Sequence, residues 1–336
     1  MKGILLVNLG TPDSTKVGDV RKYLREFLSD GRVIDIHPIA RFLLVNLIIA
    51  PFRSPKSAKE YRKLWTEKGS PLKFHSLELA KLLQESLGKD YAVELGMRYQ
   101  NPSIASALEK LKAQNPNSLL IIPLFPQYAS ATTGSVHEEV MRRIAKWQLI
   151  PTITFVDAFP AQSTMIEAYS ENGKRYMEKE KYDHFLFTYH GLPERQLKKA
   201  DKQCLANQEC CAVFNAKNRL CYRAQCFETS RKLAEALGIK EEDYTVSFQS
   251  RLGKEPWIKP YTDEVIEKLA EKGHKKVLAF SPSFVADCLE TTIEISETYS
   301  ELFHEKGGEK LQLVESLNAS PTWVKALKEI VMEYAK

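Results

Sequence analysis

The sequence predicts an α/β protein built as two Rossmann-like lobes, each with a parallel sheet flanked by helices. Three observations predict this class. Short apolar stretches rich in β-branched residues recur along the chain, and amphipathic stretches alternate with them. Several of the short stretches are continuously apolar, as strands buried on both faces of a parallel sheet must be. The length of 336 residues suffices for two domains.

The predicted strands fall into two series of four. The first series is 4–8, 92–95, 119–124 and 153–156, and the second is 185–189, 245–248, 277–280 and 311–314. Apolar residues at helical spacing predict helices over 103–114, 165–178 and 260–272. The last of these has helix start and stop signals, because Pro260 opens it and Gly273 follows it.

The two series indicate a boundary near residue 160. We therefore expect an N-terminal lobe over 1–160 and a C-terminal lobe over 161–320 with a cysteine-rich insert at 204–226. An amphipathic helix over 321–336 is expected to pack back on the first lobe.

Composition narrows the class of protein. Apolar residues make up 43% of the chain and charged residues 27%, which is typical of a soluble globular protein. The formal charge of +5 comes without a basic tract, so no nucleic-acid partner is expected. The longest apolar stretch, 42–50, is well below the ~20 residues that span a bilayer. These features predict a cytoplasmic protein.

Ligands of open parallel sheets bind beyond the carboxyl ends of the strands, so the residues there are the first candidates. His190 follows the predicted strand 185–189, with Gly191 and Pro193 shaping the turn behind it. A histidine with the ordinary pKa of about 6.5 accepts protons near neutral pH, which makes His190 a candidate catalytic base. The alternative is a structural histidine that is hydrogen-bonded within its loop.

Three carboxylates follow the predicted strand 277–280. Asp287, Glu290 and Glu294 are three and four residues apart, which predicts one face of one helix. Such a row suits a hard cation or a proton relay. A helix dipole that favours acidic residues in the first turn would explain Asp287, but it explains Glu294 poorly.

Other candidates concern an acidic or flat ligand. The loop 125–135 concentrates hydroxyls and small residues, and its Ser130 is a candidate substrate contact, although Ser135 there suits a plain helix N-cap. Arg98 could pair with a carboxylate while the adjacent Tyr99 stacks on a ring. Trp257 could cover a flat ring or serve only in core packing.

Five of the six cysteines lie close together in the chain. They are Cys204, Cys210, Cys211, Cys221 and Cys226. In a reducing compartment such crowding indicates metal binding rather than disulfides, and five thiols exceed the four that an iron–sulfur cluster or a structural zinc needs. The spacing is not C-x-x-C twice, so a zinc ribbon fits badly.

Taken together, these segments resemble the ferrochelatase family over nearly the whole chain. The resemblance rests on segments that occur in family order: 5–12, 23–30, 69–72, 126–128, Tyr189 to Pro193, 249–251 and 284–291. Any one of them alone would be weak, but all of them in order are highly specific. The family fold consists of two Rossmann-like lobes with the active-site cleft between them.

The resemblance implies roles for particular residues. His190 matches the histidine that faces the pyrroles, and Glu290 matches the essential glutamate across the porphyrin. Asp287 and Glu294 match acidic positions that continue the path of Fe²⁺, the metal substrate. Four further residues match the lining of the macrocycle pocket, namely Arg98, Tyr99, Phe284 and Trp257.

The implied reaction is insertion of Fe²⁺ into protoporphyrin IX to form protohaem, the last step of haem biosynthesis, with release of two protons. Coproporphyrin III is the alternative substrate. A chelatase that loads cobalt or nickel into another tetrapyrrole is a rival of the same fold. A non-catalytic tetrapyrrole carrier or sensor is a rival of another class.

Two further expectations come from the resemblance. The chain is similar to bacterial members whose cysteines lie inside the second lobe, which implies a [2Fe–2S] cluster held by four of the five clustered cysteines; either Cys210 or Cys211 is the one left out. The segment 36–55 would form the apolar lip of the cleft and contact the inner face of the plasma membrane peripherally. A buried helix is the alternative reading of this segment.

Overall fold

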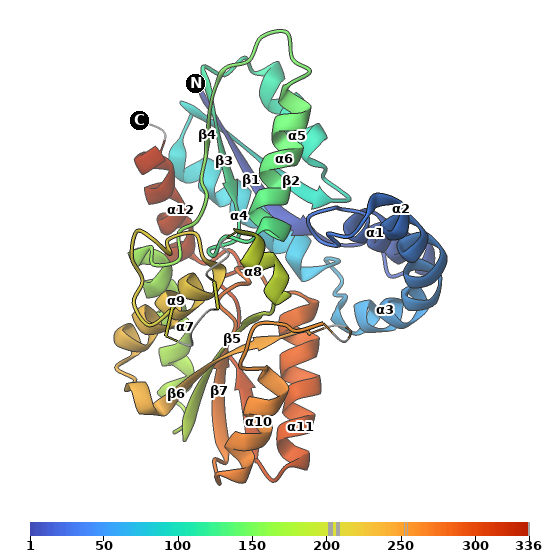
Figure 1. The fold of residues 1–336 in the computed structure, drawn as a ribbon. Helices are drawn as coiled ribbons and strands as arrows, with labels where there is room; N and C mark the ends of the chain where they lie inside the picture. The colour runs from blue at the N-terminus through green and yellow to red at the C-terminus, as the bar shows by residue number, and fades with distance from the viewer. Residues whose placement is uncertain (201–203, 206–208, 252, 254, 335–336) are drawn as a thin grey trace. The chain divides into compact units, whose positions relative to one another are not determined.

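The computed structural model describes residues 1–336 except 201–203, 206–208, 252, 254 and 335–336 (Figure 1). It divides the chain into two compact units. Unit 1 comprises residues 1–158 and 319–336, and unit 2 comprises residues 159–318. Each unit is organised around its own parallel sheet, so the predicted fold class is confirmed.

Unit 1 contains a four-stranded parallel sheet in the order β2-β1-β3-β4. Its strands are β1 (Lys2–Gly10), β2 (Tyr91–Tyr99), β3 (Ser118–Pro123) and β4 (Thr152–Phe155). Strand β1, one of the two inner strands, is apolar throughout its middle, and its residues from Ile4 to Val7 are fully buried. Burial on both faces explains why the sequence is continuously apolar there rather than alternating.

The helices of unit 1 follow its strands in the usual α/β alternation. They are α1 (Val17–Leu28), α2 (Pro38–Leu43), η1 (Leu44–Ile49), α3 (Ala50–Leu64), α4 (Pro71–Leu87), α5 (Ile104–Ala113), η2 (Ser130–Gly134), α6 (Ser135–Ile144) and α12 (Pro321–Tyr334), of which η1 and η2 are π-helices. Helices α5 and α6 bury their apolar faces against one side of the sheet (Figure 1). The C-terminal α12 packs on α4, where the Lys328 amine donates to the carbonyl of Ser86 at 2.8 Å.

One glycine in unit 1 is required by close backbone packing. Gly10 ends β1 with a φ of +110°, and a Cβ there would stand 2.0 Å from the carbonyl oxygen of Tyr99 on β2. Only glycine permits both the conformation and the approach. The carboxyl ends of β1 and β2 are therefore held together where the candidate residues of this unit lie.

Unit 2 repeats the plan, with strands in the order β6-β5-β7-β8. The strands are β5 (His184–His190), β6 (Tyr244–Gln249), β7 (Lys276–Phe280) and β8 (Lys310–Leu313). Its helices are α7 (Ser163–Met177), α8 (Glu194–Ala200), α9 (Tyr222–Leu237), the 3₁₀ turn η3 (Glu241–Asp243), α10 (Thr262–Glu271), the π-helix η4 (Leu289–Tyr299) and α11 (Ser300–Glu305). Residues of α10, η4 and α11 form one apolar cluster with β5, β7 and β8.

Candidate active site

His190 is the last residue of the buried strand β5, at the carboxyl edge of the unit 2 sheet. Its Nδ1 lies 2.7 Å from the carbonyl oxygen of Gly191. Because a carbonyl only accepts hydrogen bonds, Nδ1 carries the proton and Nε2 keeps its lone pair. The imidazole is thus held in the tautomer that a proton acceptor requires.

Aromatic rings flank this imidazole. The ring centroids of Trp257 and Phe284 lie 6.3 and 6.5 Å from that of His190. The Tyr222 hydroxyl donates to the His190 carbonyl at 2.7 Å, which fixes the backbone of the strand end. Unit 2 therefore brings together three residues that lie far apart in the sequence, at 190, 257 and 284.

Glu290 lies in the first turn of η4, and Glu294 lies one turn later. The i→i+5 bonding of a π-helix is rare and occurs frequently at functional sites. The side-chain amide of Gln249 donates to the Glu290 carbonyl at 3.0 Å. Gln249 is the register partner of His190 on the neighbouring strand, so Glu290 and His190 belong to the same edge of one sheet.

The carboxylate of Glu294 is surrounded by neutral donors. It accepts from the Ser250 hydroxyl at 2.6 Å, from the Gln249 amide at 3.3 Å and from the Tyr299 hydroxyl at 3.0 Å. Burial and the adjacent Glu294 charge raise the pKa of Tyr299 well above its ordinary value, so its hydroxyl stays protonated. The described residues include no Lys or Arg in an ion pair with Glu294.

Asp287 does not share a helix face with these glutamates, so that expectation is wrong. Helix η4 begins at Leu289, after an extended Cys288 with φ −151° and ψ −173°. The two Asp287 oxygens accept from the Ser316 backbone N–H at 3.0 Å and from the Asn318 side-chain amide at 2.8 Å. The three-residue spacing from Asp287 to Glu290 fits a helix, but the sequence does not show that the helix begins only after Asp287.

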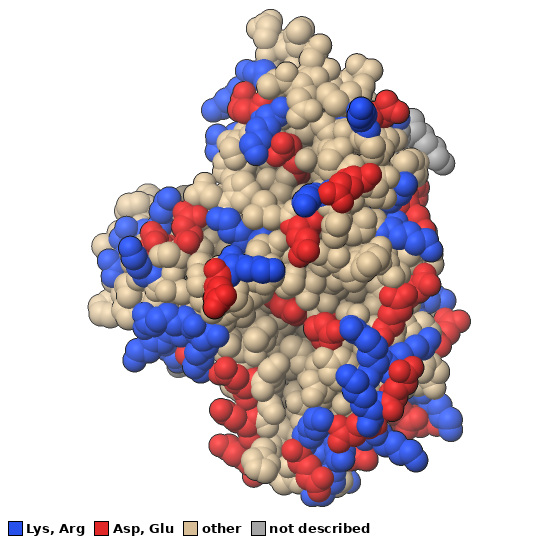
Figure 2. Space-filling model, turned by 180° about the vertical axis from the view of Figure 1, so that it is seen from behind, with Lys and Arg blue, Asp and Glu red and all other residues tan. Residues whose placement is uncertain are grey.

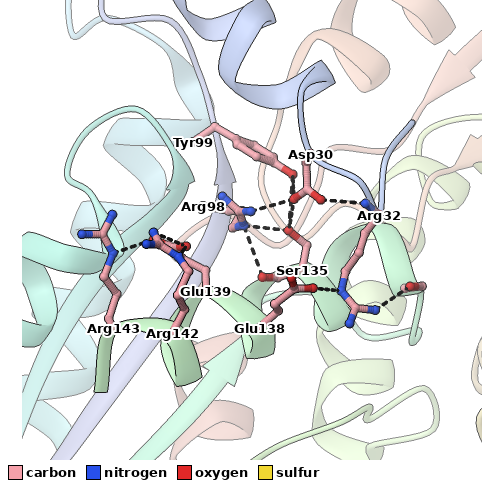
Figure 3. Close-up of polar contacts among 10 residues, drawn as sticks. Asp30, Arg32, Arg98, Tyr99, Ser135, Glu138, Glu139, Arg142 and Arg143 are labelled. Carbon is pink, nitrogen blue, oxygen red and sulfur yellow. Dashed lines mark hydrogen bonds and ion pairs between the residues drawn. The ribbon is translucent and has the colours of Figure 1, made fainter. Parts of the chain in front are cut away.

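In unit 1, Arg98 and Tyr99 end β2 and converge on Asp30, which sequence reasoning did not single out (Figure 3). Arg98 Nη2 and the Tyr99 hydroxyl donate to Asp30 Oδ2 at 2.6 and 2.9 Å. Ser135 joins them, since its hydroxyl donates to the same oxygen at 2.5 Å and accepts from Arg98 Nε at 2.6 Å. The carboxylate partner that was expected for Arg98 is thus a residue of the chain itself.

The charge of Asp30 is strongly stabilised. Burial alone would raise its pKa, but hydrogen bonds from Ser135 and the Arg32 backbone, the Arg98 charge and the Tyr99 hydroxyl hold the pKa of Asp30 below its ordinary value. Burial and the Asp30 charge in turn raise the pKa of Tyr99 far above its usual range. Asp30 and Arg98 also line a cavity of about 780 Å³ in unit 1, together with side chains of α1 and α6.

Ser130 begins the π-helix η2 and is held by Arg32. The Arg32 Nη1 donates to the Ser130 hydroxyl at 2.9 Å, and Arg32 also pairs with Glu138 on α6 (Figure 3). A hydroxyl at this position can still accept or donate a second hydrogen bond.

The apolar segment 36–55 is not a buried helix, so that alternative is wrong. It forms α2, η1 and the start of α3, and most of its large apolar side chains are exposed, although Val45 is buried. Phe52 is 78% exposed and Ile39 66% exposed, and five further apolar residues are exposed, namely Ile36, Phe42, Leu43, Leu47 and Ile48. Among the described residues, none of the helices is long and apolar enough to cross a membrane.

The clustered cysteines lie between α8 and the first turns of α9. The Cys221 thiol, at the N-cap of α9, interacts with the thiols of Cys204 and Cys211, and Cys210 Sγ lies 3.6 Å from Cys211 Sγ. Hydrogen bonds from Cys204 and Cys211, with backbone N–H groups of α9, lower the pKa of Cys221. Cys226 is fully buried within α9, and burial raises its pKa.

In the part of the chain that the structure describes, no group of three or more His, Cys, Asp or Glu side chains has the arrangement of a formed metal site. The Cys221 thiol nevertheless contacts the thiols of Cys204 and Cys211 at the N-terminus of α9.

Known proteins resemble this chain over its whole length. A family model described as Ferrochelatase matches residues 1–335. A protein of Legionella pneumophila (strain Paris) named "Ferrochelatase" is 48% identical over 332 residues, which cover 99% of each chain. A protein of Coxiella burnetii (strain CbuK_Q154) with the same name is 44% identical over 330 residues, which cover 98% of this chain and 92% of the relative.

A solved structure resembles the chain in fold. "SirB from Bacillus subtilis with Fe3+" superposes with a TM-score of 0.56 and 12% identity, covering 99% of this chain and 94% of that one. At this identity the likeness concerns the fold alone.

Proposed function

The chain belongs to the ferrochelatase family of metal chelatases, and from this premise we propose that it inserts Fe²⁺ into protoporphyrin IX to form protohaem. The observation that carries the proposal is in unit 2. A histidine with a free Nε2 lone pair and a glutamate at the start of a π-helix belong to one sheet edge, with two aromatic rings beside the histidine.

The free porphyrin carries two pyrrole N–H protons that must leave as the iron enters. We assign their acceptance to His190, because its Nδ1 is occupied by Gly191 and its Nε2 is the available base. Trp257 and Phe284 are suited to flank the macrocycle, since a flat apolar ring packs well on aromatic side chains. The two protons and the ferrous ion exchange without any change in oxidation state.

The carboxylates are assigned to the cation. We assign Glu290 as the essential acidic group, and Glu294, one turn further along η4, as the next carboxylate on the path of the ferrous ion. Carboxylate oxygens are suitable ligands for a hydrated divalent ion on its way to the porphyrin. Asp287 contributes indirectly in this assignment, because both of its oxygens already bind the segment 316–318.

In unit 1, we assign substrate contact to Ser130 and to the edge of the Arg98–Tyr99 network. Arg98 retains donors beyond those that bind Asp30 and Ser135, so a propionate of the porphyrin can add to the network without displacing Asp30.

The substrate is tested by anaerobic iron insertion with protoporphyrin IX and coproporphyrin III side by side, with formation of each haem followed by its absorption. We expect the larger kcat/KM with protoporphyrin IX. A larger kcat/KM with coproporphyrin III would identify that porphyrin as the substrate and would leave the proposed reaction, iron insertion, unchanged. Tight binding of both porphyrins without turnover would instead establish a tetrapyrrole carrier.

We also propose a [2Fe–2S] cluster on four of Cys204, Cys210, Cys211, Cys221 and Cys226. Such a cluster requires thiolates, and the Cys221 thiol contacts those of Cys204 and Cys211 at the N-terminus of α9, whose backbone N–H groups favour a thiolate at Cys221. When bound, the cluster would supply one-electron redox chemistry, and the iron-insertion step uses none of it.

The cluster is tested by the visible absorption of anaerobically purified protein. We expect charge-transfer bands in the parent, their loss in Cys221→Ser, and their retention in Cys288→Ser, whose sulfur is buried at the start of η4 outside the cysteine group. A parent without such bands, or bands that survive in Cys221→Ser, would contradict this assignment.

Membrane contact through the segment 36–55 is the last part of the proposal. The exposed apolar side chains adjoin α3, which presents five exposed cations, namely Arg53, Lys56, Lys59, Arg62 and Lys63. In Figure 2, the α1–α3 part of unit 1 lies at the left and carries Lys and Arg side chains along its lower border. An apolar patch beside a cationic one is the pattern of a peripheral site for anionic lipid.

A further inference from the structure

Gln249 is a buried residue of β6 whose side chain bonds to two other elements of unit 2, β5 and η4. It is 1% exposed and ends β6, beside His190 on β5. Its Oε1 accepts from the Thr188 hydroxyl on β5 at 3.1 Å, and its Nε2 donates to the Glu290 carbonyl at 3.0 Å and to Glu294 Oε2 at 3.3 Å. Its backbone carbonyl accepts from the Gly191 N–H at 2.8 Å.

These contacts fix the direction of the amide. The Thr188 hydroxyl donates to Oε1, so Nε2 is the end that faces η4. A flipped amide would place a carbonyl oxygen against the Glu290 carbonyl and the Glu294 carboxylate, which repel it. The structure therefore admits one orientation, and in it both amide hydrogens point at the helix that carries the glutamates.

Gln249 links the strand end at His190 to the glutamates, through its backbone on the histidine side and through its side chain on the other. His190 and Gln249 are register partners, and the Gly191 N–H that follows His190 bonds to Gln249. Ser250, held at a φ of +66°, adds a second donor to Glu294 from the next position. The sheet edge and the first turns of η4 are thus joined by two consecutive residues.

Helix η4 has apolar packing of its own besides this connection. Ile295, Tyr299 and Phe303 anchor the helix and its continuation in the apolar cluster of unit 2. Loss of the Gln249 amide would therefore leave the helix in place and free its first turn to shift. A displacement of about 1 Å at reacting groups can cost on the order of 100-fold in rate.

We propose that Gln249 is a positioning residue that sets the distance between the His190 imidazole and the Glu290 carboxylate. The inference rests on the proposed function, in which those two groups act on one porphyrin. Gln249 itself touches neither porphyrin nor iron in this account. Its contribution is exerted through the Glu290 backbone and the Glu294 carboxylate.

The first test compares Gln249→Met with a matched control. Methionine keeps the length and unbranched shape but has no donor for η4. Ser247→Ala is the control, because Ser247 is fully buried on the same strand and its hydroxyl bonds to Thr262, which reaches Gln249 through the Thr188 hydroxyl but, among the described residues, makes no hydrogen bond to η4. We expect kcat for iron insertion to fall 10- to 100-fold in Gln249→Met, with the porphyrin Kd and KM within about twofold of the parent. Ser247→Ala should stay within about twofold in kcat.

A double-mutant cycle distinguishes positioning from general loosening. Gln249→Met is combined with Glu290→Asp, which keeps the carboxylate but shortens its side chain by one methylene. If Gln249 acts through Glu290, its effect in the Glu290→Asp background should shrink to about threefold or less, whereas independent effects would multiply. Gln249→Glu serves as a second variant of native shape. At neutral pH its carboxylate would face the Glu290 carbonyl and the Glu294 carboxylate, so kcat should fall at least as far as in Gln249→Met.

The outcomes separate the two claims. A parent that metallates either porphyrin, with Gln249→Met at parental kcat or with multiplicative losses in the cycle, overturns the positioning role and leaves the proposed function intact. A parent that inserts iron into neither porphyrin overturns both. The cycle is measured with whichever porphyrin the parent metallates, so the choice of porphyrin does not affect it.

Discussion

Asp30 is the residue on which the polar contacts of unit 1 converge (Figure 3). Its side chain is only 7% exposed, and Arg98, Tyr99 and Ser135 all donate to one of its oxygens. Removal of one partner from a buried ion pair leaves the other charge without compensation, which costs far more than the pair contributes. The network therefore stabilises the end of β2 and the start of α6 in one arrangement.

We predict that Asp30→Asn lowers the free energy of unfolding by about 1–3 kcal/mol at pH 7, since it leaves the largely buried Arg98 without a counter-ion while solvent in the adjoining cavity partly screens the loss. The pKa of Asp30 is lowered on folding, so its contribution is complete above its unfolded pKa of 3.8 and is lost as pH falls below that value. The difference between variant and parent should shrink below pH 4. Denaturant titrations at pH 7 and pH 3.5 measure it.

Asp90→Asn is the control for this experiment, because Asp90 is exposed in the same unit. It should leave unfolding unchanged within about 0.5 kcal/mol. If Asp30→Asn had the same free energy of unfolding as the parent, the network would not stabilise the unit.

At the same scale, sequence reasoning found groups with distinctive chemistry but not the residues that hold them. His190 and Glu290 stand out because a histidine or a run of carboxylates after a strand is unusual. Asp30, Gln249 and Asn318 carry no such signal, since ordinary polar residues become notable only when the fold surrounds them with partners. Their roles depend on contacts between positions about 30 to 100 residues apart in sequence.

At the scale of elements, the eight strands could be predicted because burial on both faces imposes a continuous apolar pattern. The π-helices could not. Composition does not distinguish i→i+5 from i→i+4 bonding, so the segment from Asp287 to Glu294 read as one ordinary helix. The sequence could not predict either that the segment 36–55 is exposed, because an apolar helix has the same composition whether protein or lipid covers it.

We predict that the double variant Phe42→Ser, Phe52→Ser binds vesicles of anionic phospholipid at least roughly tenfold more weakly than the parent. Its melting temperature should be unchanged. Both side chains are exposed, so their apolar surface contributes to membrane transfer rather than to the core. Cosedimentation with vesicles measures the affinity, with and without 0.5 M salt.

The matched control is Leu149→Ser, Ile150→Ser, which removes two exposed apolar side chains elsewhere in unit 1. It should bind vesicles like the parent. Equal losses in the two double variants would show that general surface apolarity, rather than this segment, drives adsorption.

At the scale of the whole molecule, two similar sheets carry different groups of side chains. Unit 2 holds the histidine, the glutamates and the two aromatic rings at one sheet edge, and unit 1 holds the Asp30 network and the exposed apolar segment. The plan of two α/β units followed from length and strand pattern. What each unit does depends on the few residues at strand ends, which differ between units of the same architecture.

Anaerobic iron insertion by His190→Ala, with porphyrin binding followed by fluorescence, tests directly whether His190 is the base. We predict porphyrin affinity within a few-fold of the parent and a kcat reduced roughly 100- to 10,000-fold, since the only base proposed for the pyrrole protons is gone. His304→Ala, which alters an exposed histidine of unit 2, should retain parental turnover. Parental turnover in His190→Ala would contradict the account.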